Sequence, residues 1–175
     1  MRRLWNTTAR RIGSALALAV LTLCSLAAPA AAANQVPFTA TATAVLTGVT
    51  RLPGGLTQFD GISSGNATHL GDFTGPVMRI QDHQGNFATT TDLHGANGDD
   101  SVSLAISGRF ERTRGSCVII SMGNYTVTGG TGAFANATGS GITATEFDEC
   151  AGTAMGTYTG RSPSRTRANP GLTPG

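Results

Sequence analysis

Three carboxylates are spaced so that they could share one proton-transfer site. Asp82 follows one extended segment, and Glu146 and Asp148 lie two residues apart near the end of another. If successive strands alternate in direction, all three side chains lie at one end of the fold and point inward. A carboxylate beside apolar side chains and like charges has a raised pKa, which suits a general acid or base. We take these residues as candidate catalytic groups, with solvated rim acids as the alternative.

Two other patterns carry weaker chemical signals. Residues 130–135 match the G-x-G-x-x-G/A dinucleotide fingerprint, but that motif needs a following helix, and Gly139 and Gly141 interrupt any helix there. The three histidines of the chain are His69, His83 and His94. They do not form a recognisable set of metal ligands, so the sequence predicts no metal site and no cofactor.

Two of the three cysteines are expected to form a disulfide. Cys24 lies in an apolar N-terminal segment that we expect to be removed, which leaves Cys117 and Cys150 as an even pair in an exported chain. A bridge that closes this loop would contribute about 3 to 4 kcal/mol in the chain-entropy model.

The elements that must position these residues are β-strands. Apolar and polar residues alternate with a period of two, and turn dipeptides separate the alternating segments. Glycine interrupts every candidate helical window. Seven or eight short strands with this spacing predict an antiparallel barrel or sandwich.

The cysteines also suggest a register. A hairpin centred between Ala133 and Phe134 places residues whose numbers sum to 267 opposite one another, and Cys117 and Cys150 satisfy that sum. Following the alternation through the other hairpins predicts an inward set that includes the three acids. Its apolar members are Met78, Ile80, Phe87, Leu93, Val102, Leu104, Ile106, Ile119, Tyr125, Val127, Ile142, Ala144 and Met155. Among the residues predicted to face water are Arg79, Gln81, Thr143 and Glu149.

One segment resembles a known family. In residues 123–141, a strand runs into Gly-Gly-Thr-Gly-Ala-Phe and then into a small-residue pair and another strand; residues 71–75 show a similar likeness. This segment resembles a corner of the allene oxide cyclase and dirigent-protein barrel superfamily. The resemblance implies an eight-stranded antiparallel barrel, often a trimer, that guides cyclisation or coupling of small apolar compounds in its cavity. The family's catalytic residues have no clear counterpart positions in this chain.

Composition predicts a location and the domain limits. Four Arg precede an apolar run that ends in Ala31-Ala32-Ala33, so residues 1–33 are expected to be a secretory signal cleaved after Ala33. The apolar run is too short to span a membrane. Removal of residues 1–33 takes away four of the twelve Arg and none of the ten acids. The 142 remaining residues then have a net charge of −2, which argues against nucleic-acid binding. Residues 34–160 are predicted to form one domain, followed by a Pro- and Arg-rich disordered tail at 161–175.

Two classes of function fit this sequence. In one, the barrel binds a small apolar molecule, and an inward carboxylate handles a proton in a cyclisation or isomerisation. In the other, it is a non-catalytic ligand-binding, surface-interaction or structural module. A cavity below roughly 300 Å³ would favour the structural interpretation. The predicted ligand-binding residues are Phe87, Leu104, Ile106, Ile119, Tyr125 and Ile142.

Overall fold

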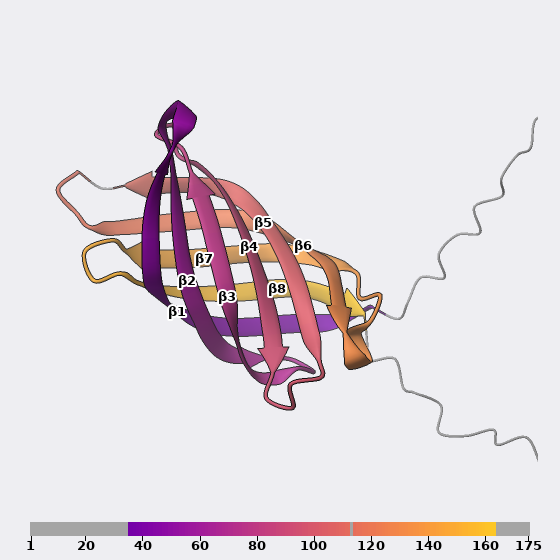
Figure 1. The fold of residues 1–175 in the computed structure, drawn as a ribbon. Helices are drawn as coiled ribbons and strands as arrows, with labels where there is room; N and C mark the ends of the chain where they lie inside the picture. Colours follow the sequence, from indigo (N-terminus) through magenta and orange to yellow (C-terminus); the bar gives the residue numbers. More distant parts are fainter. Residues whose placement is uncertain (1–34, 113, 164–175) are drawn as a thin grey trace, which may run out of the picture. The chain divides into compact units, whose positions relative to one another are not determined.

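The computed structural model describes residues 35–112 and 114–163, which form a closed antiparallel barrel of eight strands in chain order (Figure 1). The strands are β1 (Gln35–Leu52), β2 (Leu56–Ala67), β3 (Gly71–Gln81), β4 (Asn86–Gly95), β5 (Ser101–Arg112), β6 (Val118–Thr131), β7 (Gly139–Asp148) and β8 (Thr153–Pro163). Two 3-10 turns, η1 (Pro53–Gly55) and η2 (Gly132–Phe134), lie in the connections. The predicted fold, with its single disulfide, is confirmed.

The barrel closes where β1 meets β8. Phe38 pairs with Gly160, and the ladder extends to Gln35 opposite Pro163. β8 therefore continues three residues beyond the predicted domain end at residue 160. The predicted leader and the rest of the predicted tail lie outside the described residues.

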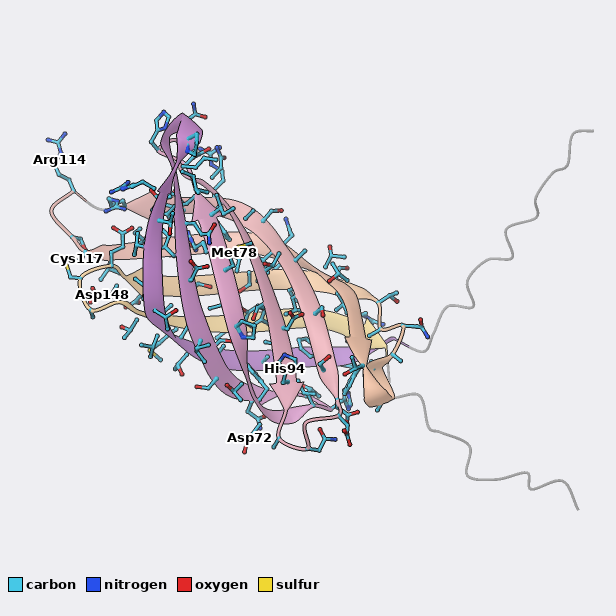
Figure 2. The ribbon with its side chains drawn as sticks, in the orientation of Figure 1. Asp72, Met78, His94, Arg114, Cys117 and Asp148 are labelled. Carbon is cyan, nitrogen blue, oxygen red and sulfur yellow. A yellow bond between two sulfur atoms is a disulfide. The ribbon has the colours of Figure 1, made fainter. Side chains whose placement is uncertain are left out.

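Short connections define two ends of the barrel. The β1–β2, β3–β4, β5–β6 and β7–β8 connections lie at what we call the disulfide end, because Cys117 and Cys150 are there. Figure 2 shows Arg114, Cys117 and Asp148 at this end and Asp72 near the opposite one. The opposite end, which we call the terminal end, carries the other connections and the pairing between the start of β1 and the end of β8.

The inner face was predicted correctly for β4, β5 and β6 and wrongly for β3, β7 and β8. On β4, β5 and β6, the predicted inward residues are buried. On β3 and β7, the pairing differs from the predicted one by a single residue: Phe87 lies opposite Gln81 rather than Asp82, and Asp148 lies opposite Val118. Because side chains alternate along a strand, a slip of one residue reverses every side chain on it.

This reversal corrects a group of predicted orientations. Met78, Met155 and Ile142 are 37%, 68% and 62% exposed, and Ala144 is exposed as well. Ile80 is half-buried and shares the outer face of β3 with Met78. In their place, Arg79, Gln81 and Thr143 face inward and are buried.

Apolar side chains fill the terminal end of the lumen. They form one cluster with members from six strands, β1 to β6, and from the connections: Phe38, Ala40, Ala67, Leu70, Phe73, Phe87, Leu93, Val102, Leu104, Ile106, Tyr125, Val127, Phe134 and Ala137. Tyr125 lies in this cluster opposite Gly141, which itself pairs with Gly160. A Cβ at either glycine would clash with the tyrosine ring or its hydroxyl, so these glycines make room for the ring.

Among the described residues, no helix has the length and apolar character needed to cross a bilayer.

Candidate functional site

A cavity of about 100 Å³ lies in the lumen. Its lining is mostly apolar and includes Phe59, Phe87, Leu93, Ile106 and Phe147. Phe59 and Phe147 meet edge to face with ring centroids 5.4 Å apart. The cavity is below the 300 Å³ that most drug-sized ligands require, but an apolar cavity of about 150 Å³ can hold a single benzene ring. At about two-thirds of that volume, this cavity limits an occupant to a short chain smaller than a benzene ring.

Two charged residues belong to the cavity lining, Arg79 and Asp60, and the Asp60 carboxylate accepts hydrogen bonds from Gln58 Nε2. Arg79 projects inward from β3, is only 9% exposed, and packs its guanidinium against two aromatic rings. The guanidinium carbon lies 4.1 Å from the centroid of the Phe87 ring and 5.6 Å from that of Phe110. Such cation–π contacts stabilise a desolvated guanidinium by roughly 2 kcal/mol.

Arg79 has few hydrogen-bond partners for a buried cation. Nε donates to Gln81 Oε1 at 3.1 Å, and Nη2 donates to Ser121 Oγ at 3.0 Å. Both acceptors are neutral, and no carboxylate of the described residues forms an ion pair with Arg79. Burial lowers the pKa of Arg79 to about 10, and the charge of Glu149 acts in the opposite direction. The lumen thus holds a positive charge at neutral pH.

Glu149 is the acidic group whose charge acts on Arg79, and it lies at the disulfide end. Glu149 accepts a hydrogen bond from Gln81 Nε2 at 3.3 Å and forms an ion pair with Arg112. Gln81 therefore connects Glu149 to Arg79. The side chains of Arg112 and Glu149 are 46% and 21% exposed, so this ion pair lies at the wet mouth of the lumen.

Three buried hydroxyls have no hydrogen-bond partner within the described part of the chain: those of Tyr125, Thr143 and Ser162. Thr143 is 6% exposed and lines the cavity beside Tyr158, its cross-strand neighbour. Burying a polar group without a partner is costly, so such atoms are rare in native interiors. The Thr143 hydroxyl is therefore a free hydrogen-bonding group at the cavity wall.

The three candidate catalytic carboxylates lie at the disulfide end but do not point into the lumen. Glu146 is exposed on the outer face of β7. Asp82 lies in the β3–β4 turn, where it accepts hydrogen bonds from the side chain and backbone of Asn86 and from the backbone N–H of Gln84. These bonds, led by that from the Asn86 side chain, hold the pKa of Asp82 below its ordinary value, opposite to the predicted shift.

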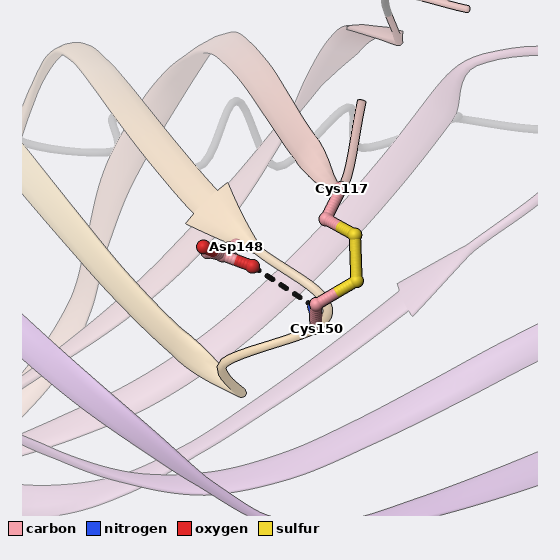
Figure 3. Close-up of side chains that lie close together, drawn as sticks. All are labelled: Cys117, Asp148 and Cys150. Carbon is pink, nitrogen blue, oxygen red and sulfur yellow. Dashed lines mark hydrogen bonds between the residues drawn. A yellow bond between two sulfur atoms is a disulfide. The ribbon is translucent and has the colours of Figure 1, made fainter. Parts of the chain in front are cut away.

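Asp148 organises the β7–β8 turn. Its Oδ1 accepts hydrogen bonds from the backbone N–H groups of Cys150 and Ala151, each at 2.9 Å. Figure 3 shows Asp148 beside the Cys117–Cys150 disulfide, whose Cα atoms are 5.5 Å apart. The two sulfurs and this carboxylate lie close enough to suggest metal ligands, but the sulfurs are bonded to each other. The cluster is a covalent staple with a hydrogen-bonded turn.

The six predicted ligand-binding residues occupy three different environments. Phe87 and Ile106 line the cavity. Leu104, Ile119 and Tyr125 are almost fully buried and face inward without lining it. Ile142 faces solvent, so its predicted inward orientation is wrong.

Sequence reasoning missed Arg79, Gln81, Thr143 and Glu149 as lumen groups. A signal was present on β3, because Phe73 shares the alternation of Arg79 and is 4% exposed. The segment Val77–Gln81 has apolar residues on both faces, and the choice fell on the face with Met78 and Ile80. The large aromatic at the start of the strand was the better guide.

Comparisons with known proteins found no match among protein-family models, curated proteins or solved structures.

Proposed function

We propose that this protein is a secreted, non-catalytic binding module that holds one small, largely apolar molecule in the barrel lumen. The observation that carries the proposal is the cavity, with aromatic and aliphatic walls and an unpartnered Thr143 hydroxyl. Apolar walls with a few placed polar groups are typical of small-molecule sites. The size of the cavity restricts the ligand to a short chain.

The resemblance of residues 123–141 to the allene oxide cyclase and dirigent-protein superfamily supports the same proposal. Members of that superfamily hold small apolar compounds inside a barrel. Binding is proposed here in preference to cyclisation because Asp82, Glu146 and Asp148 point away from the cavity. The N-terminal segment with its Arg residues, apolar run and Ala-x-Ala end supports export.

A titration with 1-butanol followed by amide NMR tests this function. We expect saturable shift changes confined to lumen residues such as Phe87, Ile106 and Thr143. Ala154→Leu places a larger side chain at the cavity wall and should abolish the response. Ala88→Leu, on the exposed outer face of β4, is the matched control and should preserve it. Shifts that are absent, or that survive Ala154→Leu, would contradict lumen binding.

A second candidate function, self-association, is favoured by the outer surface. A groove of about 550 Å³ crosses the outer face of β6, β7, β8 and β1, and its lining includes the exposed Ile120 and Met155. Exposed apolar surface of this kind marks interaction sites. The occupant we propose is a second copy of the chain, as the trimer implied by the resemblance would require. Sedimentation should give a trimer mass that Met155→Glu reduces to that of a monomer; a monomeric wild-type protein would refute self-association.

A further inference from the structure

Arg79 is placed to serve as a recognition group as well as a structural one. A buried cation is costly unless a counter-charge and hydrogen bonds replace its lost hydration. The two hydrogen bonds of Arg79 go to neutral oxygens, and its aromatic neighbours, Phe87 and Phe110, provide cation–π contacts but no counter-charge. Glu149 acts on it across Gln81 rather than through a direct ion pair.

The Arg79 guanidinium also has N–H donors with no acceptor among the described residues. An arginine side chain has five N–H donors, of which Arg79 uses one on Nε and one on Nη2 for described acceptors. Nη1 donates to no acceptor among the described residues. Since Arg79 is part of the cavity wall, the unused donors belong to a group that borders empty space.

A second, independent observation points to the same space. Thr143 extends from β7 into the lining of the same cavity, and its buried hydroxyl has no partner. Arg79 with its unused donors and the Thr143 hydroxyl therefore border one mostly apolar cavity, whose lining also includes Asp60, a carboxylate already hydrogen-bonded to Gln58 Nε2. A planar carboxylate can accept two parallel hydrogen bonds from the fork of a guanidinium.

From this arrangement we propose that the lumen ligand is a small monocarboxylate whose acid group pairs with Arg79 while its apolar part occupies the space between Phe59, Phe87 and Phe147. The inference rests on the proposed function and narrows it to one chemical class. No bond is made or broken in this binding event. Arg79 supplies the charge and Thr143 a hydrogen bond, while the aromatic walls exclude water and strengthen both interactions.

Butyrate and 1-butanol test the carboxylate preference, because they have the same chain length and differ in charge. NMR titration of the protein should show butyrate binding about tenfold tighter or more than 1-butanol, as expected for hydrogen bonds to a charged group. Arg79→Met should abolish this preference, so that butyrate binds no tighter than 1-butanol to the variant. Arg109→Met, at an exposed arginine on β5, is the matched control and should leave both affinities unchanged.

A second measurement does not depend on a folded variant. In the wild-type protein, butyrate should shift the Arg79 Nε–H resonance, and 1-butanol should not. If 1-butanol binds in the lumen but butyrate binds no tighter and leaves this resonance unmoved, the carboxylate site is refuted and the proposed binding function stands. If neither compound binds, both proposals fail.

Discussion

The guanidinium of Arg79 lies 4.1 Å from the centroid of the Phe87 ring across the β3–β4 hairpin. Phe87 is paired with Gln81, so Arg79 and Phe87 are diagonal neighbours on the inner face of the sheet. The contact requires both strands to present these side chains to the lumen. The contact between Arg79 and Phe87 is therefore evidence for the strand register that places both side chains in the cavity lining.

The two tyrosines provide a pH signature of the same interior. Tyr125 and Tyr158 are the only tyrosines of the chain, and burial raises the pKa of Tyr125 to about 12 and that of Tyr158 above its ordinary value. Ultraviolet absorbance should show no tyrosinate forming near pH 10 in the folded protein and two tyrosinates forming there in urea. A tyrosine that titrates near pH 10 in the folded protein would contradict this burial.

Stability should fall as the pH rises from about 10 to 12. Over this range the folded state holds more protons than the unfolded state at both tyrosines, so each tyrosine lowers the free energy of unfolding as the pH rises. Arg79 acts in the opposite direction, because its pKa is lowered to about 10 and the unfolded state holds its proton longer. The two tyrosines together outweigh Arg79, so the free energy of unfolding falls as the pH rises. Tyr125→Phe should flatten the dependence measured by urea unfolding, and an unchanged slope would count against this assignment.

Thr143→Val should stabilise the ligand-free protein by about 1 kcal/mol, because it replaces an unpartnered buried hydroxyl with a methyl group of similar shape. The free energy of unfolding in urea measures the change. Thr159→Val, on the exposed outer face of β8, is the control and should change stability little. A destabilised Thr143→Val would mean that the hydroxyl has a partner in solution.

Replacing both Cys117 and Cys150 with serine should lower the free energy of unfolding by about 3 to 4 kcal/mol, because the bridge closes a loop across 33 positions of the sequence. The comparison is urea unfolding of this variant and of the oxidised wild-type protein. A loss below about 1 kcal/mol would show that the staple contributes little beyond the β6–β7 ladder.

Glu146 and Glu149, three residues apart in the chain, should behave differently when each is replaced with glutamine. Glu149→Gln removes the ion pair with Arg112 and the negative charge that acts on Arg79, so the Arg79 Nε–H resonance should shift. Glu146→Gln changes a carboxylate on the outer face and should leave that resonance in place. NMR spectra of the two variants make the comparison, and a larger response to Glu146→Gln would contradict the observed register.

The strand pattern and the disulfide were predictable from the sequence, whereas the inward faces of β3, β7 and β8 were not. The inner faces of β4, β5 and β6 follow from a clear contrast between apolar residues such as Leu104 and Ile106 and the polar residues that alternate with them. The register errors there were even in number, which leaves the faces unchanged: Ile106 lies opposite Tyr125 rather than Ser121.

On β7, the cysteines themselves misled the prediction. They were taken as directly opposed ladder partners, but the ladder begins at Val118 opposite Asp148, and both cysteines lie beyond it. There the backbone N–H of Glu149 donates to the carbonyl of Cys117, and the turn begins. A disulfide in a turn shows that two segments are close but does not determine which residues pair in the adjacent ladder. The prediction therefore placed Glu146 inside and Glu149 outside, and the structure has them the other way round.

The most direct test of the account is a nuclear Overhauser measurement from the Arg79 Nε–H in the folded protein. The structure predicts cross-peaks to the ring of Phe87 and to the side chain of Ser121, with none from Met78 to that ring. Cross-peaks between Met78 and Phe87, together with an Arg79 resonance that exchanges freely with water, would place the arginine outside and remove the charged wall of the cavity.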